Sequence, residues 1–415
     1  MAAGTVNVVI GASIFVVPAQ LASCLGVYAP FAFLVCAIAI GAIAICFAEG
    51  GSRVPTSGGA YGYVEAAFGP LAGYLAGTLL WFSDALACGG IAAALADTVV
   101  TILPVRWAAA AHALIVVIVI AAVALVNLGG IARGARLINV STTLKLIPLA
   151  IFIAAGAAAF HGATFFQTAS PNAGGLGHAL ILALFAFTGM EISLCASGEV
   201  AQPSQTIPRA LLIAMIFLTL LYISIQVVAQ GILGPSLAQS SVPLADAMAR
   251  VSPLLRLLML GGTALSMFGF ISSDLLCSPR ILLALARDGL LPRPLGQVDA
   301  RTHTPNVAIL CYATIAIALA LSGSFVELAV LSTLACAVLY IGGCAAALRL
   351  ASRGVALAGE PLNFRWLGAS ALTGIISMIV LIALAERAEI LGLIALLAII
   401  VIVYLLQTRL VRATA

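Results

Sequence analysis

Twelve apolar segments follow one another along this chain, with short polar stretches between them. Each is close to the about 20 residues that a helix needs to cross the hydrocarbon core of a bilayer. Continuous apolar runs of this kind, rather than alternating segments of about ten residues, predict membrane-spanning helices and not a β-barrel. The expected spans are residues 4–25, 30–50, 70–100, 107–127, 137–160, 178–200, 209–233, 254–284, 305–322, 325–350, 367–385 and 389–408.

Composition supports a membrane protein. Of the 415 residues, 63% are hydrophobic and 8% are charged, which is too little charge to cover the surface of a soluble protein of this size. The spans use nearly the whole chain, so we predict a single all-α transmembrane domain over residues 1–415. The nine cysteines are scattered through apolar runs without metal-ligand spacing, which favours buried apolar packing over disulfides or metal binding.

The distribution of arginine predicts the orientation. Thirteen arginines fall in connections on one side of the expected spans and four on the other, so the positive-inside rule places the thirteen in the cytoplasm. With an even number of spans, both termini are expected there, in a multi-pass protein of the cell membrane. The four outer arginines are Arg106, Arg250, Arg256 and Arg387.

Two spans are interrupted. The first contains "VIGASIF", and the sixth contains "FAFTGMEIS" from Phe185 to Ser193. The first interruption could belong to a signal peptide, but no basic residues precede it and its apolar run is too long. Paired glycine-interrupted segments in corresponding positions indicate a transporter built from inverted repeats. The repeats would cover about 1–160 and 176–350, with helices appended over about 367–408.

Four stretches resemble one family. "IGASIFVVPA" is similar to the first-span break of the amino acid–polyamine–organocation (APC) transporters, and "AEGGSRVPTSGGAYGYVEAAFGPLAGYLAG" to their first cytoplasmic loop. "FAFTGMEISLCASGEVAQPSQTIPRAL" resembles the sixth span and its loop, and "SPRILLALARDGLLPRPLGQVDARTHTPNVAIL" the loop between spans eight and nine. The resemblance implies a LeuT-type fold of about 12 transmembrane helices, a 5+5 inverted repeat with two additional C-terminal helices. This chain has Gly11-Ala12-Ser13 where the family usually has Gly-Ser-Gly.

Each break would leave backbone groups for a zwitterionic substrate. Where a helix unwinds in a bilayer, its freed N–H and C=O groups need other partners. A helix N-terminus after Gly11 carries positive partial charge, which suits a carboxylate, and carbonyl ends suit an ammonium. We expect the amides of Ala12, Ser13 and Ile14 to hold the carboxylate, and the carbonyls of Val9, Phe185 and Thr188 to hold the amino group. The alternative is a glycine kink without a ligand.

Two aromatic residues stand beside the second break. Phe185 or Phe187 could close over a substrate, or either could simply pack between helices. The resemblance favours Phe185 as the lid and leaves both readings open for Phe187.

Charged residues inside spans are costly and usually functional. Lys145, the one lysine of the chain, lies about eight residues into span five, roughly 12 Å deep. Removal from water disfavours a charged ammonium, so we predict proton coupling or conformational coupling at Lys145. The alternative is a lysine permanently paired with an acid. The resemblance places its ammonium between spans one, five and eight, with Ser272, Ser273 and the Gly11 carbonyl as neighbours.

Three acidic residues also lie inside spans. Glu191 matches an acid that some members of the resembled family use in proton sensing, and it could instead bridge helices as a protonated carboxyl. Asp84 could contact a substrate side chain, or pair with Lys145 or a serine. Asp274 is a weaker candidate.

These features together predict a proton-coupled secondary active amino acid transporter that alternates access around a midplane site. An amino acid exchanger and a transport-inactive amino acid sensor are the alternatives. A membrane enzyme is disfavoured because the four histidines lie near span ends or in loops, and no nucleotide-binding motif supports ATP-driven transport. The expected partners are an amino acid, protons and the lipid bilayer, with no cofactor, metal or nucleic acid.

Overall fold

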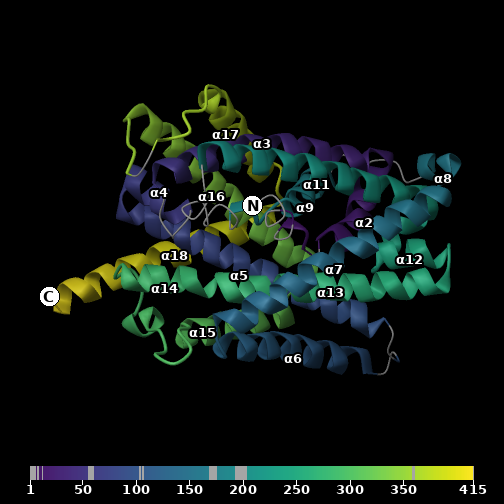
Figure 1. The fold of residues 1–415 in the computed structure, drawn as a ribbon, viewed down its shortest axis with the longest axis horizontal. Helices are drawn as coiled ribbons and strands as arrows, with labels where there is room; N and C mark the ends of the chain where they lie inside the picture. Colours follow the sequence, from purple (N-terminus) through teal and green to yellow (C-terminus); the bar gives the residue numbers. More distant parts are fainter. Residues whose placement is uncertain are drawn as a thin grey trace.

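The structure, a computed structural model, describes residues 6, 9–11, 13–54, 60–101, 104, 107–167, 175–191, 203–357 and 360–414. It describes the side chains of these residues except 131–143, 203–208 and 408–414. Within these ranges, all regular secondary structure is helical (Figure 1).

The long helices reproduce the expected spans closely. Apolar length in the sequence set these expectations, and most of the helices begin and end within a few residues of them. The exceptions include the first and sixth spans, where α2 begins at Ser13 and α9 ends at Phe185; residues 192–200 of the expected sixth span lie outside the described residues. The long helices are α2 (Ser13–Leu25), α3 (Ala29–Arg53), α5 (Pro70–Val100), α6 (Ala108–Leu128), α7 (Ile131–Ala158), α9 (Leu176–Phe185), α11 (Pro203–Leu233), α13 (Pro253–Cys277), α15 (Asn306–Ser322), α16 (Phe325–Ser352), α17 (Leu367–Ala383) and α18 (Arg387–Thr414).

Short helices lie in the connections between the long ones. They are α4 (Ala60–Phe68), α8 (Gly162–Phe166), α12 (Pro243–Ala249) and α14 (Pro279–Arg287), together with 3₁₀ turns at Gly26–Tyr28, Gly234–Gln239 and Arg293–Gly296. The expected eighth span, 254–284, corresponds to one apolar helical stretch over Pro253–Arg287. Within it, α13 and α14 are separated at Ser278, because Pro279 has no amide hydrogen to continue the helical bonding.

The helices have the length and composition of membrane spans. In the described part of the chain, seven helical stretches are long and apolar enough to cross a membrane, and four shorter apolar helices of 10–17 residues accompany them. Large apolar side chains such as Leu125 and Leu220 point outward from the bundle, where lipid replaces water as the solvent. The chain is a multi-pass membrane protein.

Helix α5 forms the centre of the bundle. Of its most apolar window, 94% is buried, and it packs against α16, α15 and α13. Helices α6 and α18 are mostly exposed and lie at the periphery. Side chains of α5 therefore face the interior on nearly all sides, and a polar residue on this helix has to find a partner inside the protein.

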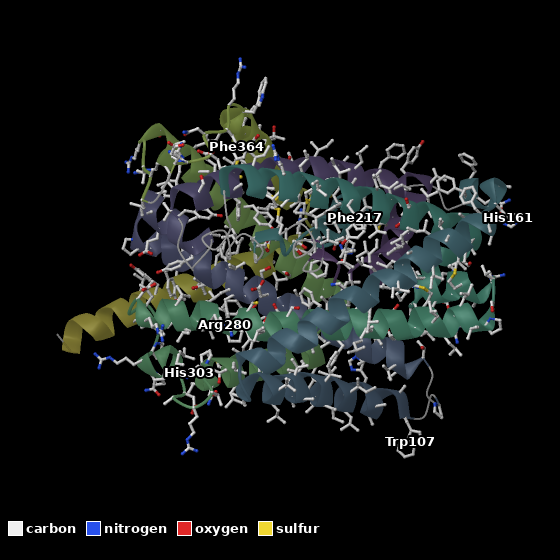
Figure 2. All side chains as sticks on the ribbon, viewed as in Figure 1. Trp107, His161, Phe217, Arg280, His303 and Phe364 are labelled. Carbon is white, nitrogen blue, oxygen red and sulfur yellow. The ribbon has the colours of Figure 1, made fainter. Side chains whose placement is uncertain are left out.

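The connecting segments lie at two opposite ends of the bundle. Helices α8 and α12 lie at one end, and α4, α14 and the C-terminus lie at the other (Figure 1). The labelled side chains agree, since Trp107 and His161 lie toward the first end and His303 toward the second (Figure 2).

Arg53 anchors a connection at the second end. Its guanidinium donates to Glu49 Oε1 at 2.8 Å and to Asn363 Oδ1 at 2.6 Å. It also donates to the Val355 carbonyl at 3.1 Å. Both charged groups are buried, so this pair holds the connection between α16 and α17 against the end of α3.

Helices α7 and α13 approach each other closely at Gly262. A Cβ atom added to Gly262 would lie 2.5 Å from Pro148 Cγ, inside the contact distance of two carbon atoms. The proline ring is rigid and cannot turn aside as a flexible side chain would. Glycine is therefore required at 262 for α13 to lie against α7.

We expect Gly262→Ala to destabilise the protein by about 1–3 kcal/mol, because the methyl group overpacks against Pro148. Gly261→Ala is the matched control, since a Cβ added at the neighbouring Gly261 meets nothing within 4 Å. Thermal unfolding of both variants in one detergent tests this. Equal midpoints would contradict the packing argument.

Candidate substrate-binding site

The first spanning segment is broken at Ile10 and Gly11. These two residues lie outside helical structure, between Val9 and the start of α2 at Ser13. A side chain from a different helix bonds each of three successive carbonyls. Tyr222 Oη donates to Val9 O at 3.3 Å, Lys145 Nζ to Ile10 O at 2.6 Å, and Ser266 Oγ to Gly11 O at 2.9 Å.

These bonds come from α11, α7 and α13, so the break is the point where four helices are joined. Gly11 also permits a close approach, because a Cβ atom there would lie 3.1 Å from Phe270 Cδ2. Lys145 bonds the Ile10 carbonyl, one residue before the predicted Gly11 carbonyl, which accepts from Ser266. A contact of Lys145 with the Gly11 carbonyl stays a prediction.

The second break follows α9. This helix ends at Phe185, and residues 186–189 form a turn in which Gly189 has φ +100°, a conformation that favours glycine. The Phe185 carbonyl accepts from the Thr188 amide at 3.3 Å and from the Thr188 hydroxyl at 2.8 Å. Both lone pairs of this carbonyl are used in this conformation.

Glu191 contacts the backbone of the second break. Its carboxylate oxygens each lie 3.2 Å from the Gly189 amide, and Tyr340 Oη of α16 donates to Oε2 at 2.9 Å. The side chain is buried. Glu191 thus joins α16 to the turn, as expected for an acid that bridges helices.

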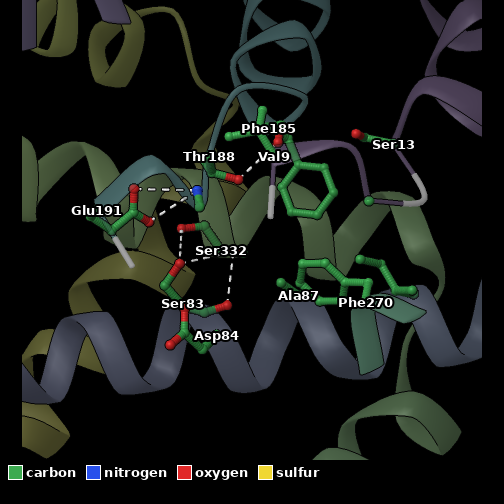
Figure 3. Close-up of a pocket in the computed structure, with 13 residues that line it drawn as sticks. Val9, Ser13, Ser83, Asp84, Ala87, Phe185, Thr188, Glu191, Phe270 and Ser332 are labelled. Carbon is green, nitrogen blue, oxygen red and sulfur yellow. Dashed lines mark hydrogen bonds between the residues drawn. The ribbon is translucent and has the colours of Figure 1, made fainter. Parts of the chain in front are cut away.

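A pocket lies between the two breaks (Figure 3). Seven predicted site residues line it: Val9, Gly11, Ser13, Asp84, Phe185, Thr188 and Glu191. The lining residues that sequence reasoning did not identify are Ser83, Ala87, Ile91, Gly189, Phe270 and Ser332. The sequence thus placed the two breaks and Asp84 at one pocket, and missed most of the α5, α13 and α16 contributions.

Part of the missing wall had a sequence signal. Ala87 and Ile91 follow Asp84 by three and seven residues, the spacing of one helix face, so Asp84 implied them. Ser332 had no such signal. It meets α5 by donating to the Ser83 carbonyl at 2.9 Å, a contact between segments far apart in sequence.

Other predicted residues lie away from the pocket lining. Phe187 is buried against Phe33 and Tyr222, with ring centroids 6.2 and 5.3 Å away, which is the packing alternative. Ile14 is buried in the core. Ala12 lies outside the described residues, so its part in carboxylate binding stays a prediction.

The two serines predicted beside Lys145 bond within their own helix. Ser272 Oγ donates to the Phe268 carbonyl at 2.8 Å, and Ser273 Oγ to the Gly269 carbonyl at 3.1 Å. A contribution of either hydroxyl to Lys145 stays a prediction.

Asp84 pairs with a serine. Its Oδ2 lies 2.7 Å from Ser278 Oγ, and that hydroxyl also lies 2.9 Å from Asp274 Oδ1. Tyr312 of α15 donates to Asp274 Oδ2. In the described part of the chain, no group of three His, Cys, Asp or Glu side chains is arranged to hold a metal ion.

A membrane protein with two interrupted spans beside one pocket has the layout typical of secondary transporters. The family model for amino acid permeases matches residues 1–413, and the chain belongs to this family. It is a family of transporters and not of enzymes. The match confirms the resemblance to the APC transporters.

Relatives agree with this assignment. An uncharacterized transporter of Mycobacterium tuberculosis is 32% identical over 316 residues, which are 75% of this chain and 70% of that protein. The branched-chain amino acid permease BcaP of Bacillus subtilis is 27% identical over 346 residues, 78% of this chain and 73% of that protein. The protein of the same name from Lactococcus lactis is 24% identical over 357 residues, 79% and 75% of the two chains.

We expect Ser266→Ala to destabilise the protein by about 1–3 kcal/mol, because it removes a buried donor from the Gly11 carbonyl. Ser272→Ala is the matched control on the same helix, since the Ser272 hydroxyl bonds the Phe268 carbonyl of its own helix, which is already part of the helical bonding. Thermal unfolding in one detergent compares them. A loss in Ser272→Ala as large as that in Ser266→Ala would contradict a special role for the break.

Proposed function

We propose that the protein is a secondary active transporter of neutral aliphatic amino acids, with alternating access around the pocket between the two breaks. The observation that carries this proposal is the lining of that pocket. It combines interrupted backbone from the first and sixth spans with apolar side chains from α5, α9 and α13.

The backbone at the breaks suits the charged ends of an amino acid. The first amides of α2, at Ser13 and Ile14, have no partner within their own helix and carry its positive partial charge, so they suit a carboxylate. The Val9 carbonyl accepts from the Gly11 amide at 2.8 Å and from Tyr222 Oη at 3.3 Å, so an ammonium that binds there has to replace the longer Tyr222 bond. Binding to the Phe185 carbonyl requires the Thr188 hydroxyl to turn away first.

The apolar part of the pocket suits an aliphatic side chain. Ala87, Ile91 and Phe270 line it on the α5 and α13 sides, and Phe185 lies where a lid is expected. Both acids in the lining have partners in the protein, Ser278 for Asp84 and Tyr340 for Glu191. The names of the two bacterial permeases, branched-chain amino acid permeases, favour the same class of substrate.

A LeuT-type arrangement supports alternating access. We infer two inverted repeats of five spans, about 1–160 and 176–350, followed by two helices. In support, the breaks lie in the first span of each proposed repeat, and α2 packs against α9. The arginine distribution supports cytoplasmic termini in the cell membrane.

Lys145 suits a coupling role. Its buried ammonium holds the Ile10 carbonyl at the first break, so a change in its charge acts directly on the backbone that binds substrate. We infer that protonation of Lys145 stabilises this conformation of the break. Loss of the proton would weaken a charge-assisted hydrogen bond and free the first span to move.

The first test identifies the substrate in proteoliposomes. We expect counterflow of leucine, isoleucine and valine, and none of arginine, glutamate or the corresponding amines. The reason is that the proposed site needs an ammonium, a carboxylate and an uncharged side chain in one molecule. Binding by thermal shift without counterflow would indicate a sensor and contradict transport. Counterflow of cationic amino acids instead would contradict the substrate class.

The second test addresses coupling. Lys145→Met keeps an unbranched apolar stem and removes the charge, so we expect uptake to lose its response to an imposed pH gradient. The measurement is leucine uptake with and without the gradient, with Arg365→Met, at an exposed position in a connection, as the charge-removal control. An unaltered gradient response in Lys145→Met would refute the coupling role.

A further inference from the structure

One buried hydroxyl lies between two buried carboxyl groups. Ser278 Oγ is 2.7 Å from Asp84 Oδ2 and 2.9 Å from Asp274 Oδ1. The exposed fractions are 7% for Asp84 and 3% for Asp274, and Ser278 is fully buried. The three residues join α5 to the end of α13, at the point where α14 begins.

The number of hydrogen atoms available to these contacts favours an additional proton. A serine hydroxyl has one hydrogen and can donate one bond, while an ionised carboxylate can only accept. Two ionised carboxylates cannot both be bonded by the single hydrogen of Ser278. Both contacts are full hydrogen bonds if one of the two acids carries a proton and donates it to Ser278 Oγ.

The surrounding donors indicate which acid is neutral. Asp274 also accepts from the Tyr312 hydroxyl, and the Cys88 thiol lies beside it, so negative charge is better stabilised there. Asp84 has Ser278 as its hydrogen-bond partner. We propose that Asp84 is protonated and shares its proton through Ser278 with an ionised Asp274, which makes the pair a second proton site beside the pocket.

Nearby charges support one negative charge rather than two. In the part of the chain that the structure describes, no Lys, Arg or His side chain lies within 4.0 Å of either carboxyl group. The other ionisable groups that face the pair are acidic or neutral: Glu191, Tyr312, Cys88, Cys277 and Cys336. Two buried carboxylates without a cation would repel each other and lose their hydration.

The position of the pair connects the proton to transport. Asp84 lines the pocket, and Ser278 lies between the end of α13 at Cys277 and the start of α14 at Pro279. If Asp84 releases its proton, one of the two contacts to Ser278 loses its hydrogen and the two negative charges repel each other between α5 and α13. This step rests on the proposed function, because it requires the pocket to open and close during transport.

A neutral Asp84 also bears on specificity. A protonated carboxyl group presents no full negative charge to the pocket, and its own hydrogen is directed at Ser278. It therefore favours a substrate with an uncharged side chain over a cationic one.

Infrared spectroscopy of the purified protein at neutral pH tests the proton directly. We expect Asp84→Asn to lose the carbonyl band intensity of one protonated carboxylic acid, because the variant has an amide in place of that acid. The amide N–H can still donate to Ser278, so the contact itself is kept. Asp97→Asn is the control on the same helix, an acid that is 61% exposed, and its band should match that of the unchanged protein. Full retention of the band in Asp84→Asn would overturn the proposal.

Transport then tests whether the proton moves. We expect leucine uptake by Asp84→Asn to depend less steeply on pH than uptake by Asp97→Asn, since the amide cannot release a proton. Band loss with an unchanged pH profile would overturn the link to transport. Failure of the unchanged protein to transport any amino acid would count against the proposed function alone, because the spectroscopic result does not depend on flux.

Discussion

Unpaired backbone groups are costly away from water, and this constraint organises the centre of the protein. Interrupting the first span frees successive carbonyls at residues that are buried. A tyrosine, a lysine and a serine from three other helices bond them. The interruption therefore fixes where α7, α11 and α13 must lie. Gly11 and Ser13, at this break, also line the pocket, so the bonded carbonyls and the pocket wall lie on the same short stretch of chain.

Close helix packing is a consequence of these bonds. The Ser266 hydroxyl reaches the Gly11 carbonyl only if α13 lies near the first break, and Gly262, one turn earlier, lets α13 approach α7 at Pro148. Lys145 precedes that proline by three residues on α7, so the packing contact and the ammonium lie on neighbouring turns. Small residues at the contact and polar side chains at the break are thus parts of the same interface, as is common between helices in membranes.

The sequence predicted elements that depend on local patterns. The length of the apolar segments predicted the helices, and glycine inside two of these segments predicted both breaks. Each of these predictions needs only the residues of a single segment. The level along α13 at which a serine meets the first break was harder to predict. Ser266 and Ser273 are seven residues apart and lie on the same face of the helix, so the helical pattern alone could not tell which of them bonds the break. About 10 Å of helix separates them, and the Ser266 hydroxyl is the one bonded to the Gly11 carbonyl. A serine was among the predicted partners of Asp84, but the sequence did not indicate that it is Ser278, which is far away along the chain.

Hydrogen bonding inside the protein also determines what the pocket offers to a substrate. Most polar side chains in its wall already have hydrogen-bond partners within the protein. Ser83 bonds Ser332, Thr188 bonds the Phe185 carbonyl, and Glu191 bonds Tyr340. Asp84 is directed at Ser278. What is left for a ligand is backbone at the two breaks and apolar surface from Ala87, Ile91 and Phe270. Such a division suits a molecule with a charged ammonium and carboxylate at one end and a hydrocarbon at the other. On the proposed function, the main chain at the two breaks would recognise the ammonium and carboxylate groups that all amino acids share. The apolar side chains and the charge state of Asp84 and Glu191, the acids in the pocket wall, would then select among amino acids.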